Sequence, residues 1–457
     1  MPIRSVHLTN YYHKTSGGIS TAYNHLLESA NRHERYVSLI VPGEETSVEE
    51  IGKFGRIYYV KSDFSPVFDK RYRLMMPWKT YLFEGAPVKE ILRKEDPDII
   101  EIGEKYTLSL MAGLVRKHVL TVASKRPLLV QFSCERMDDN VRAFMSGGRF
   151  GKWLARRYTA NYTLPMFDYH LTNSDYTAQE FFDAVSLESD PHRSKMFFNW
   201  CWRFLRAPKV GLRERVFVNQ CGVDNSNFDP GRKSAARREA FLEEFGLPKN
   251  ARLLLYAGRI SPEKNTDLLI DALEAVSDGS SDEYRLLIAG GGPTAEQLTE
   301  KAGKRLPGKI VMIGHMTDKD KLADLFANCD VFIHPNPREP FGITPLEAMA
   351  SGLAVVAPNS GGLLSYANET NAWLSEPNGT AFAASIRSVF DDTELRARRV
   401  EAGVATAARY DWDSSTDSLF ALYDKMYADF TSRQELFDYP DADSSVDFSR
   451  TMSASST

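Results

Sequence analysis

The segment SVHLTNYYHKTSGGISTAYNHLLESANRHERYVSLIV, residues 5–41, decides the fold class. Residues 5–12 alternate in character and are rich in strand formers, a glycine-containing loop follows at 14–20, and residues 21–32 place apolar side chains at helical spacing. Residues 36–41 predict a second strand. Because strand, loop, helix and strand in this order form the unit of a parallel doubly wound sheet, we expect an α/β fold.

Strand-like segments continue along the chain in two successive series separated by helical segments. They lie at residues 99–102, 128–132, 169–172 and 216–218, and then at 253–257, 286–289, 310–313, 331–333 and 354–357. Two such series predict two Rossmann-like domains with parallel sheets, whose strand carboxyl ends face each other across a cleft.

The chain has 457 residues, which is too long for one hydrophobic core. We predict an N-terminal domain over residues 1–224 and a C-terminal domain over 225–409. An amphipathic helix within 410–433 is expected to return to the N-terminal domain. Residues 434–457 are acidic and rich in serine, and this composition predicts disorder.

Composition restricts the class of protein and its partners. The formal net charge is -5, which argues against a dedicated nucleic-acid binder, and 43% of the residues are hydrophobic, as in a globular protein. The four cysteines are far apart and show no CxxC spacing, so we expect neither a zinc site nor a disulfide framework, and a cytoplasmic protein. No apolar run is long enough for a signal or a membrane span, although peripheral contact with the inner face of the membrane stays open.

The most informative motif is EPFGITPLEAMASGLAVVAPNSGG, residues 339–362. Thr344 precedes a proline and stands three residues before Glu347, so the spacing predicts a capping box in which a helix starts at Pro345. Glu347 can combine this capping with contact to a ligand. Glu339 lies before the helix and has no capping use, so the cap does not explain it.

The same helix start predicts an anion site. Backbone N–H groups around Gly342, Ile343 and Thr344 lack partners within the helix and suit a diphosphate. A second motif, YAGRISPEKNTDLLIDAL at residues 256–273, places two cations, Arg259 and Lys264, in the loop after a strand. Cations there stabilise the charge that develops on a departing nucleotide diphosphate.

These two motifs resemble the retaining glycosyltransferase family 4, also called the group 1 glycosyltransferases, which has the two-domain GT-B architecture. The resemblance covers most of the chain. Further strings fit the family in the same order: SGGIST at 16–21, NSDYTAQEF at 173–181, QCGVD at 220–224, LLIAGGGP at 286–293 and ADLFANCDVFIHPNPREPFG at 323–342.

The resemblance implies roles for single residues. Arg259 and Lys264 would bind the diphosphate, Glu339 would contact the donor sugar, and Glu347 would hold the ribose hydroxyls. Gly17 and Gly18 would close over the phosphates from the other domain, and the loop formed by Gly314, His315 and Met316 would lie against the base.

One string departs from the family pattern. In SCERMDD, residues 133–139, Cys134 stands where related sequences commonly have a histidine that contacts the transferred sugar. A thiol is a weak hydrogen-bonding group, so Glu135 can assume this contact, the donor sugar can differ, or activity can be low. Cys134 as an inert buried thiol is an equal alternative.

Three other patterns favour structural roles. Gly290 and Gly292 partly match a dinucleotide fingerprint, but Pro293 breaks the match and a tight strand-to-helix turn is favoured. Asp318-Lys319-Asp320 suits the start of a helix better than a metal, so we expect no catalytic metal and no cofactor. Glu339 and Glu347 as glycosidase carboxylates form a weaker hypothesis.

Aromatic and basic residues alternate in HRSKMFFNWCWRFLRAPK, residues 192–209, and in RFGKWLARRY, residues 149–158. This mixture suits the headgroup region of an anionic membrane, while the alternative is that the aromatic side chains belong to the core. The resemblance implies a retaining glycosyltransferase that moves a hexose from a UDP- or GDP-sugar to an acceptor that the sequence does not identify. A lipid-linked or glycolipid acceptor is one candidate. The alternatives are a nucleotide-sugar epimerase or hydrolase of this fold, and a non-catalytic nucleotide-sugar binding protein.

Overall fold

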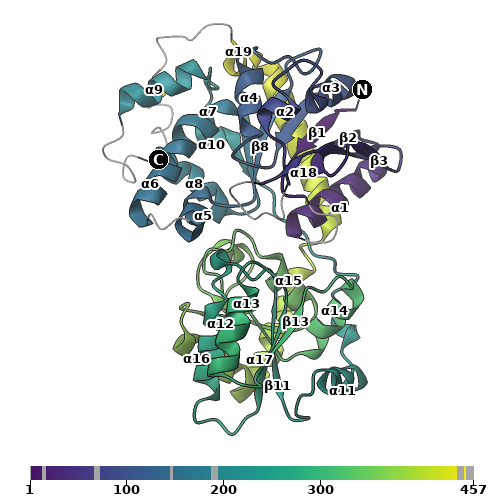
Figure 1. Cartoon of the computed structure of the whole chain (residues 1–457), viewed down its shortest axis with the longest axis vertical. Coiled ribbons are helices and arrows are strands. Elements are labelled where there is room, and N and C mark those ends of the chain that lie inside the picture. The colour runs from purple at the N-terminus through teal and green to yellow at the C-terminus, as the bar shows by residue number, and fades with distance from the viewer. Residues whose placement is uncertain are drawn as a thin grey trace. The chain divides into compact units, whose positions relative to one another are not determined.

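The computed structural model describes residues 2–12, 17–65, 73–144, 148–186, 194–439 and 447–448. The chain divides into two compact units (Figure 1). Unit 1 contains residues 1–220 and 413–457, and unit 2 contains residues 221–412. Unit 1 is therefore built from both ends of the chain.

Unit 1 is organised around an eight-stranded sheet in the order β10-β9-β8-β7-β1-β2-β4-β3. All neighbouring strands run parallel except β3, which pairs with β4 in the antiparallel sense. The strands are β1 (Ser5–Leu8), β2 (Val37–Gly43), β3 (Ser47–Ile51), β4 (Gly55–Lys61), β7 (Ile99–Ile102), β8 (Leu128–Ser133), β9 (Tyr169–Thr172) and β10 (Val216–Val218), with a separate two-stranded ribbon of β5 (Asp63–Phe64) and β6 (Arg73–Leu74).

Helices cover both faces of this sheet. They are α1 (Gly18–Arg32), α2 (Pro77–Thr80), α3 (Pro87–Glu95), α4 (Ser109–Arg116), α5 (Met137–Phe144), α6 (Gly148–Tyr158), α7 (Leu164–Met166), α8 (Asp175–Val185), α9 (Lys195–Phe204), α10 (Leu212–Arg215), α18 (Trp412–Ser432) and α19 (Gln434–Phe437). A π-helical segment, η1 (Thr159–Thr163), joins α6 to α7 without a break.

Unit 2 has a six-stranded parallel sheet in the order β13-β12-β11-β14-β15-β16. Its strands are β11 (Arg252–Ala257), β12 (Tyr284–Ala289), β13 (Ile310–Gly314), β14 (Val331–Ile333), β15 (Ala354–Pro358) and β16 (Trp373–Ser375). Its helices are α11 (Ala235–Glu244), α12 (Asp267–Ser277), α13 (Ala295–Arg305), α14 (Lys319–Asn328), α15 (Ile343–Ala350), α16 (Gly379–Asp391) and α17 (Thr393–Ala407), with short 3-10 turns η2 (Pro230–Arg232), η3 (Pro262–Lys264) and η4 (Gly362–Ser365).

The central strands of both sheets are buried on both faces, as parallel sheets require, whereas the edge strand β3 is exposed. Along β11, Leu253 and Leu255 enter one hydrophobic cluster while Leu254 and Tyr256 enter the cluster on the opposite face. Helices therefore pack on either side, and the loops at the strand ends are left to carry polar side chains. These results confirm the expected α/β class with two parallel sheets.

Helix α18 packs on unit 1. Its buried side chains Phe420, Tyr423 and Met426 belong to one cluster with residues of α1 and of the sheet. The hydroxyl of Tyr423 donates to the buried carboxylate of Glu101, which also accepts a hydrogen bond of 3.2 Å from Tyr23. Helix α18, near the end of the chain, therefore completes the core that α1 begins.

The predicted disorder of residues 434–457 is wrong for the residues that the structure describes. Residues 434–437 form α19, and Phe437, Tyr439 and Phe448 are buried. Phe448 packs against Trp202 of α9, with ring centroids 5.6 Å apart. Aromatic side chains in an acidic, serine-rich context provide this packing. The rest of the predicted tail lies outside the described residues.

Candidate functional site

The loops that follow β11 and β14 bring two charged side chains together. These strands are parallel neighbours at the centre of the unit 2 sheet, so their carboxyl ends lie at one edge. Lys264 ends the 3-10 turn after β11, and Glu339 lies between β14 and α15. The Nζ atom of Lys264 is 2.9 Å from Oε1 and 2.8 Å from Oε2 of Glu339.

Glu339 is held by three residues, and only 8% of its surface is exposed. Besides Lys264, the side-chain amide of Asn336 donates to Oε2 over 2.9 Å, and Nε2 of His334 lies 3.4 Å from the same oxygen. Burial alone would raise the pKa of Glu339, but Lys264 and His334 outweigh it and lower the pKa below its ordinary value. The carboxylate is therefore ionised at neutral pH.

The loop that carries Arg259 and Lys264 is held in shape by its neighbours. The hydroxyl of Tyr256 donates to the Arg259 carbonyl over 2.7 Å, and Nδ2 of Asn265 donates to the Pro335 carbonyl over 3.0 Å. Arg259 is half-buried on this same loop. Both predicted cations therefore lie at the carboxyl end of β11, as the motif indicates.

The glycines of the LLIAGGGP string have a structural role in this arrangement. A Cβ atom on Gly290 would lie 1.8 Å from the Gly258 carbonyl oxygen, and one on Gly292 would lie 2.0 Å from the Ile260 carbonyl oxygen. The loop after β12 thus packs backbone to backbone against the loop that carries Arg259. This close packing accounts for the glycines, so a bound dinucleotide is not needed to explain them.

The predicted capping box at the start of α15 is wrong. The helix begins at Ile343, its N-cap is Gly342, and no side chain caps it. Gly342 adopts φ 86°, a left-handed conformation that favours glycine, and its carbonyl accepts a hydrogen bond from the hydroxyl of Tyr366. The helix therefore starts two residues earlier than predicted, and Glu347 falls in its second turn, beyond reach of the N-cap.

This helix start lies directly after Glu339 in the chain. The first N–H groups of a helix have no partner within it, and those of Gly342, Ile343 and Thr344 belong to this class. Glu347 is half-buried beside them. Burial raises the pKa of Glu347 to about 7, an effect that Lys319 opposes and Asp224 adds to.

A surface hollow of about 430 Å³ lies beside the edge strand β13. It is lined by Glu244, Phe245, Val311, Met312, Ile313, His315, Met316, Thr317, Asp318 and Lys321. The predicted base-binding residues His315 and Met316 thus belong to its wall, directly after Gly314, the last residue of β13. Asp318 caps α14, since its Oδ1 accepts the Lys321 N–H over 3.0 Å. The helix-start role expected for Asp318 is confirmed.

A second polar site lies in unit 1, at the carboxyl end of β8. The carboxylate of Glu135 accepts a hydrogen bond of 2.7 Å from Asn140 and one of 3.4 Å from the hydroxyl of Tyr11. The pKa of Tyr11 is raised by burial and by the charge of Glu135, with Cys134 among the smaller causes. Cys134 and Glu135 are both half-buried, so they stay within reach of a small molecule.

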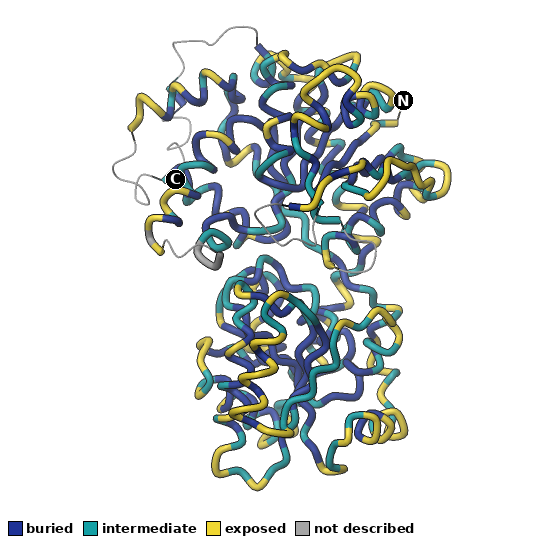
Figure 2. Tube along the Cα trace, viewed as in Figure 1, coloured by how far each residue is buried: buried dark blue, intermediate teal, exposed yellow. Residues whose placement is uncertain are grey.

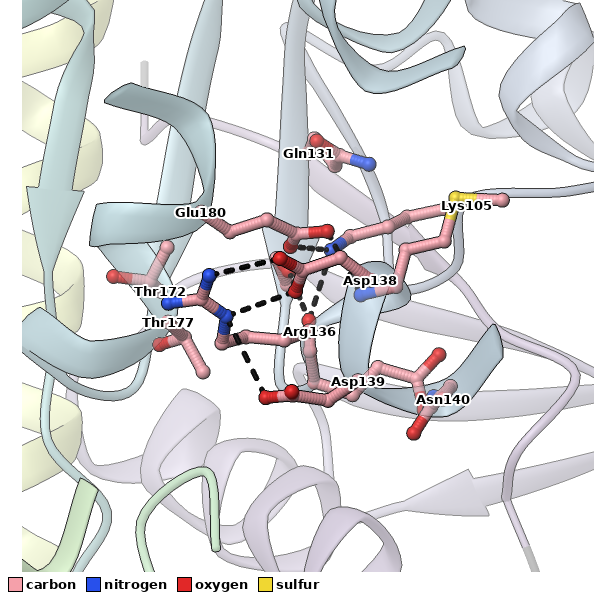
Figure 3. A network of polar contacts seen from close by, with 12 residues as sticks. Lys105, Gln131, Arg136, Asp138, Asp139, Asn140, Thr172, Thr177 and Glu180 are labelled. Carbon is pink, nitrogen blue, oxygen red and sulfur yellow. Dashed lines mark hydrogen bonds and ion pairs between the residues drawn. The ribbon is translucent and has the colours of Figure 1, made fainter. Parts of the chain in front are cut away.

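A buried network fixes the backbone of this second site (Figure 3). Lys105 pairs with Glu180, both of them buried, and also donates to the Glu135 carbonyl over 2.8 Å. Arg136 lies beside them and binds Asp138 through two hydrogen bonds of 3.0 and 3.1 Å. Paired charges with this many hydrogen bonds hold the loop after β8 in one geometry.

Gly17 and Gly18 form the start of α1. Gly17 is its N-cap with φ 104°, Gly18 is its first residue, and both are exposed. Residues 13–16 of the predicted glycine loop lie outside the described residues. The predicted loop at 14–20 therefore ends at Gly17 and becomes helical three residues before position 21.

The basic and aromatic segment 192–209 divides between core and surface; residues 192–193 lie outside the described residues. Phe198 and Trp202 of α9 are fully buried, whereas Phe197, Trp200 and Phe204 are exposed. Of the two alternatives that the sequence left open, packing in the core therefore holds for Phe198 and Trp202. Over the described ranges, none of the helices has both the length and the apolar composition that a bilayer crossing requires.

Sequence patterns did not single out several of the polar residues found at these sites. His334, Asn336 and Tyr366 surround Glu339 and the helix start. His334 and Asn336 follow directly after β14, and this position is the signal that could have found them, since polar residues at the ends of parallel strands gather at one edge of the sheet. Within the described part of the chain, no group of three or more His, Cys, Asp or Glu side chains is arranged to hold a metal ion.

Residues 237–405 match the family model described as glycosyl transferases group 1. This region contains Arg259, Lys264, Glu339 and Glu347. The match confirms the resemblance that the two motifs indicate.

One relative extends the similarity to most of the chain, and a second covers about half of it. A GDP-mannose-dependent alpha-(1-6)-phosphatidylinositol dimannoside mannosyltransferase of Mycobacterium tuberculosis is 28% identical over 427 residues, which is 93% of this chain and 97% of that protein. A D-inositol 3-phosphate glycosyltransferase of Stackebrandtia nassauensis is 33% identical over 220 residues, which is 46% of this chain and 48% of that protein.

Solved structures share the fold over nearly the whole chain. Sucrose-phosphate synthase from Thermosynechococcus elongatus superposes with a TM-score of 0.68 at 17% identity, covering 93% of this chain and 100% of that one. HepE of Anabaena, solved with UDP and glucose, gives a TM-score of 0.65 at 17% identity with the same coverage. The fold is therefore that of GT-B glycosyltransferases.

Proposed function

Because the protein is a glycosyltransferase of group 1, we propose that it transfers a hexose from a nucleotide diphosphate sugar to a lipid-linked acceptor, with retention at the anomeric carbon. The observation that carries this proposal is the cluster of Lys264, Asn336 and His334 around Glu339, directly before the start of α15. The cluster combines a cation, a buried carboxylate and the N–H groups of a helix start at one edge of the unit 2 sheet.

In the proposed reaction the diphosphate of the donor lies at the start of α15. Its charge is held by the N–H groups of Ile343 and Thr344 and by the cations Arg259 and Lys264. As the bond between the anomeric carbon and the phosphate oxygen breaks, negative charge grows on the leaving diphosphate. Both cations stabilise that charge, and this interaction is stronger in the transition state than in the bound donor.

The acceptor hydroxyl attacks the anomeric carbon from the face that the diphosphate leaves. Its proton passes to the departing phosphate oxygen as the new glycosidic bond forms, so that no side-chain nucleophile is needed. Glu339 is ionised and supplies a hydrogen-bond acceptor for the sugar hydroxyls. Glu347 serves the ribose, and Glu135 with Cys134 is proposed to contact the transferred sugar. No metal ion or cofactor enters this scheme.

We further propose that the donor is a GDP-sugar, with GDP-mannose as the first candidate. The mycobacterial relative that spans nearly the whole chain is named as GDP-mannose-dependent. The hollow beside β13 is lined by His315, Met316 and Asp318. Guanine presents an N–H and an amino group side by side, and a carboxylate accepts such a pair of donors. Uracil offers one N–H and matches the hollow less well.

A lipid-linked acceptor is proposed because the same relative is named for a phosphatidylinositol dimannoside. Such an acceptor stays in its bilayer, so the enzyme would work as a peripheral protein at an anionic membrane surface. The four cysteines lie within the described residues and form no disulfide, which suits the reducing, cytoplasmic side of that membrane.

The test is a transfer assay with radiolabelled GDP-mannose and, in parallel, labelled UDP-glucose. Each donor is incubated with the protein and with vesicles that contain phosphatidylinositol or its mannosides. We expect label from GDP-mannose in the lipid fraction, and an axial anomeric linkage by NMR. Label released only as free sugar would indicate a hydrolase, and binding of either donor without any turnover would indicate a binding protein; both outcomes contradict the proposal.

A further inference from the structure

Helix α9 turns an aromatic stripe toward solvent. Met196 is 83% exposed, Trp200 55% and Phe204 51%, and four-residue spacing places them on one face of the helix. The rings of Trp200 and Phe204 are stacked with centroids 5.3 Å apart. The opposite face, with Phe198 and Trp202, is fully buried. The exposed stripe therefore does not serve to pack α9 against the core of unit 1.

Helix α6 carries a second stripe of the same kind. Phe150, Trp153 and Leu154 are exposed at helical spacing, while Ala155 on the other side is buried. Phe150 is 67% exposed and stacks on Trp153, with ring centroids 5.5 Å apart. Three outward apolar side chains on one short helix differ from the scattered single exposures that are normal for surfaces.

The two helices are tied together within unit 1. Trp202 of α9 donates from its ring nitrogen to the Ala160 carbonyl over 2.8 Å, and Ala160 lies in the π-helical continuation of α6. Figure 1 shows α9 and α6 along the same side of unit 1, and Figure 2 shows exposed stretches on both. The stripes therefore belong to one region of the unit.

Cations accompany both stripes. The Nζ atom of Lys117 lies 3.4 Å from the centroid of the Phe204 ring, and the guanidinium of Arg157 lies 4.5 Å from that of Trp153. Lys195 and Arg203 lie on α9 itself. The whole chain has a net charge of -5, so this is a local basic surface on an acidic protein. Aromatic rings with cations beside them suit the headgroup region of an anionic bilayer.

We infer that α9 and α6 together form the surface that docks this protein on anionic lipid, with Met196, Trp200 and Phe204 from one helix and Phe150, Trp153 and Leu154 from the other entering the interface. A second copy of the chain fits this surface less well. In a two-fold interface the same residues meet each other, so the cations of one copy would face those of its partner. The inference rests on the proposed function in one respect: a lipid-linked acceptor is the reason that the protein would need to dock on a membrane.

The test uses the full-length protein and vesicles of phosphatidylcholine with about 30% phosphatidylglycerol, without donor or acceptor. One variant carries Met196→Ser, Trp200→Ser and Phe204→Ser, and another carries Phe150→Ser, Trp153→Ser and Leu154→Ser. The matched control carries Trp78→Ser and Phe83→Ser, two aromatic residues of unit 1 that are 54% and 63% exposed on other segments. Circular dichroism melts establish that each variant is folded.

We expect wild type and control to co-sediment equally, and each stripe variant to bind about tenfold more weakly. Binding of the wild type should also weaken when salt is raised to about 0.5 M, since cations supply part of the attraction. Absence of wild-type binding, equal binding by all variants, or an equal loss in the control would each overturn the inference. A wild-type dimer that the stripe substitutions convert to monomer would assign the surface to a second copy instead.

Because no sugar is present in this experiment, its failure leaves the proposed transfer reaction untouched. Conversely, a protein that docks through both stripes but transfers no hexose would retain the docking surface and contradict the proposed function.

Discussion

The ammonium group of Lys264 lies within 3 Å of both carboxylate oxygens of Glu339, at 2.9 and 2.8 Å, although 75 residues separate them in the chain. The pair forms because β11 and β14 are neighbouring parallel strands whose next loops meet at one edge. A bound diphosphate would compete with Glu339 for the same cation. Glu339 would then be released to accept hydrogen bonds from the sugar.

Replacement of the two cations should remove most of the activity. We expect Lys264→Ala and Arg259→Ala each to lower kcat by about 100-fold or more, because both act on charge that develops in the transition state. Steady-state rates with GDP-mannose measure this. Lys301→Ala is the matched control, since Lys301 pairs with Asp267 on the surface of the same unit. A near-wild-type kcat in either site variant would refute the assigned role.

The ion pair itself can be tested through stability. Lys264→Ala leaves a buried carboxylate without its cation, so the free energy of unfolding at pH 7 should fall by about 1–3 kcal/mol, the cost of a buried group that has lost its partner. Adding Glu339→Gln removes the unpaired charge and should restore most of that loss without restoring turnover. Urea unfolding of wild type, single and double variants measures the cycle.

This effect should depend on pH in a defined direction. The pKa of Glu339 is lowered in the folded protein, so the stability that its charge contributes is present above the ordinary value and is lost as the pH falls. The difference between wild type and Lys264→Ala should therefore shrink below about pH 4. If adding Glu339→Gln to Lys264→Ala destabilises the protein further at pH 7, the unpaired carboxylate is not the source of the stability lost in Lys264→Ala.

The contribution of Glu347 to the stability of the folded protein should show the opposite pH dependence. Its pKa is raised from 4.5 to about 7, so the folded protein keeps a proton that the unfolded chain loses between these values. Wild-type stability should fall as the pH rises through this window and change no further above it. Glu347→Gln cannot ionise, so its advantage over wild type should grow to about 1 kcal/mol, less than the full shift would give because the side chain is half-buried.

Calorimetry at pH 5 and pH 8, without nucleotide, measures this difference in Tm. Glu369→Gln serves as the control, because Glu369 is an exposed glutamate of the same unit. An advantage of Glu347→Gln that is equal at both pH values would contradict the raised pKa.

Asp318 should determine the choice of base. Asparagine also caps helices well, so Asp318→Asn should leave the stability of α14 unchanged while placing a donor where guanine also donates. We expect kcat/KM for GDP-mannose to fall by about 10- to 100-fold, with little change for a UDP-sugar. Asp320→Asn, two residues further on, is the control. Equal losses for both nucleotides would remove Asp318 from the base site.

The reaction should proceed without a divalent cation. Arg259 and Lys264 are assigned the charge-stabilising role that a metal would otherwise perform, so activity should survive an excess of chelator unchanged. The measurement is the transfer rate with chelator present, compared with the rate after magnesium or manganese is restored. A rate that collapses and recovers with the metal would contradict this assignment.

Much of the fold could be predicted because apolar strands followed by glycine loops and helices leave strong local patterns. The segments 99–102, 169–172, 216–218 and 331–333 form strands with the predicted bounds. Strand β3 was missed because it is an exposed edge with charged side chains, and β16 because only three residues form it. Burial of Phe448 could not be foreseen, since it depends on Trp202 far away in the chain.

The site was predictable where residue types carry the chemistry locally. The motif at 256–273 does place Arg259 and Lys264 in one loop, but the contact of Lys264 with Glu339 depends on the strand order. The start of α15 was misplaced because the spacing of Thr344 and Glu347 suggests a cap that does not form; the helix begins after Gly342, whose carbonyl is bound by Tyr366, 24 residues further along. Local pattern cannot supply a contact made by tertiary structure.

The discontinuity of unit 1 has a consequence for biosynthesis. A ribosome releases residues 1–220 and then all of unit 2 before residue 413 emerges. Until then Tyr23 and Glu101 lack the Tyr423 side chain that closes over them. Unit 2 is contiguous and can complete its core first, while the earlier-made unit waits with an apolar surface uncovered. A stop codon that removed α18 would therefore leave unit 2 whole and unit 1 unfinished, a target for chaperones and proteases.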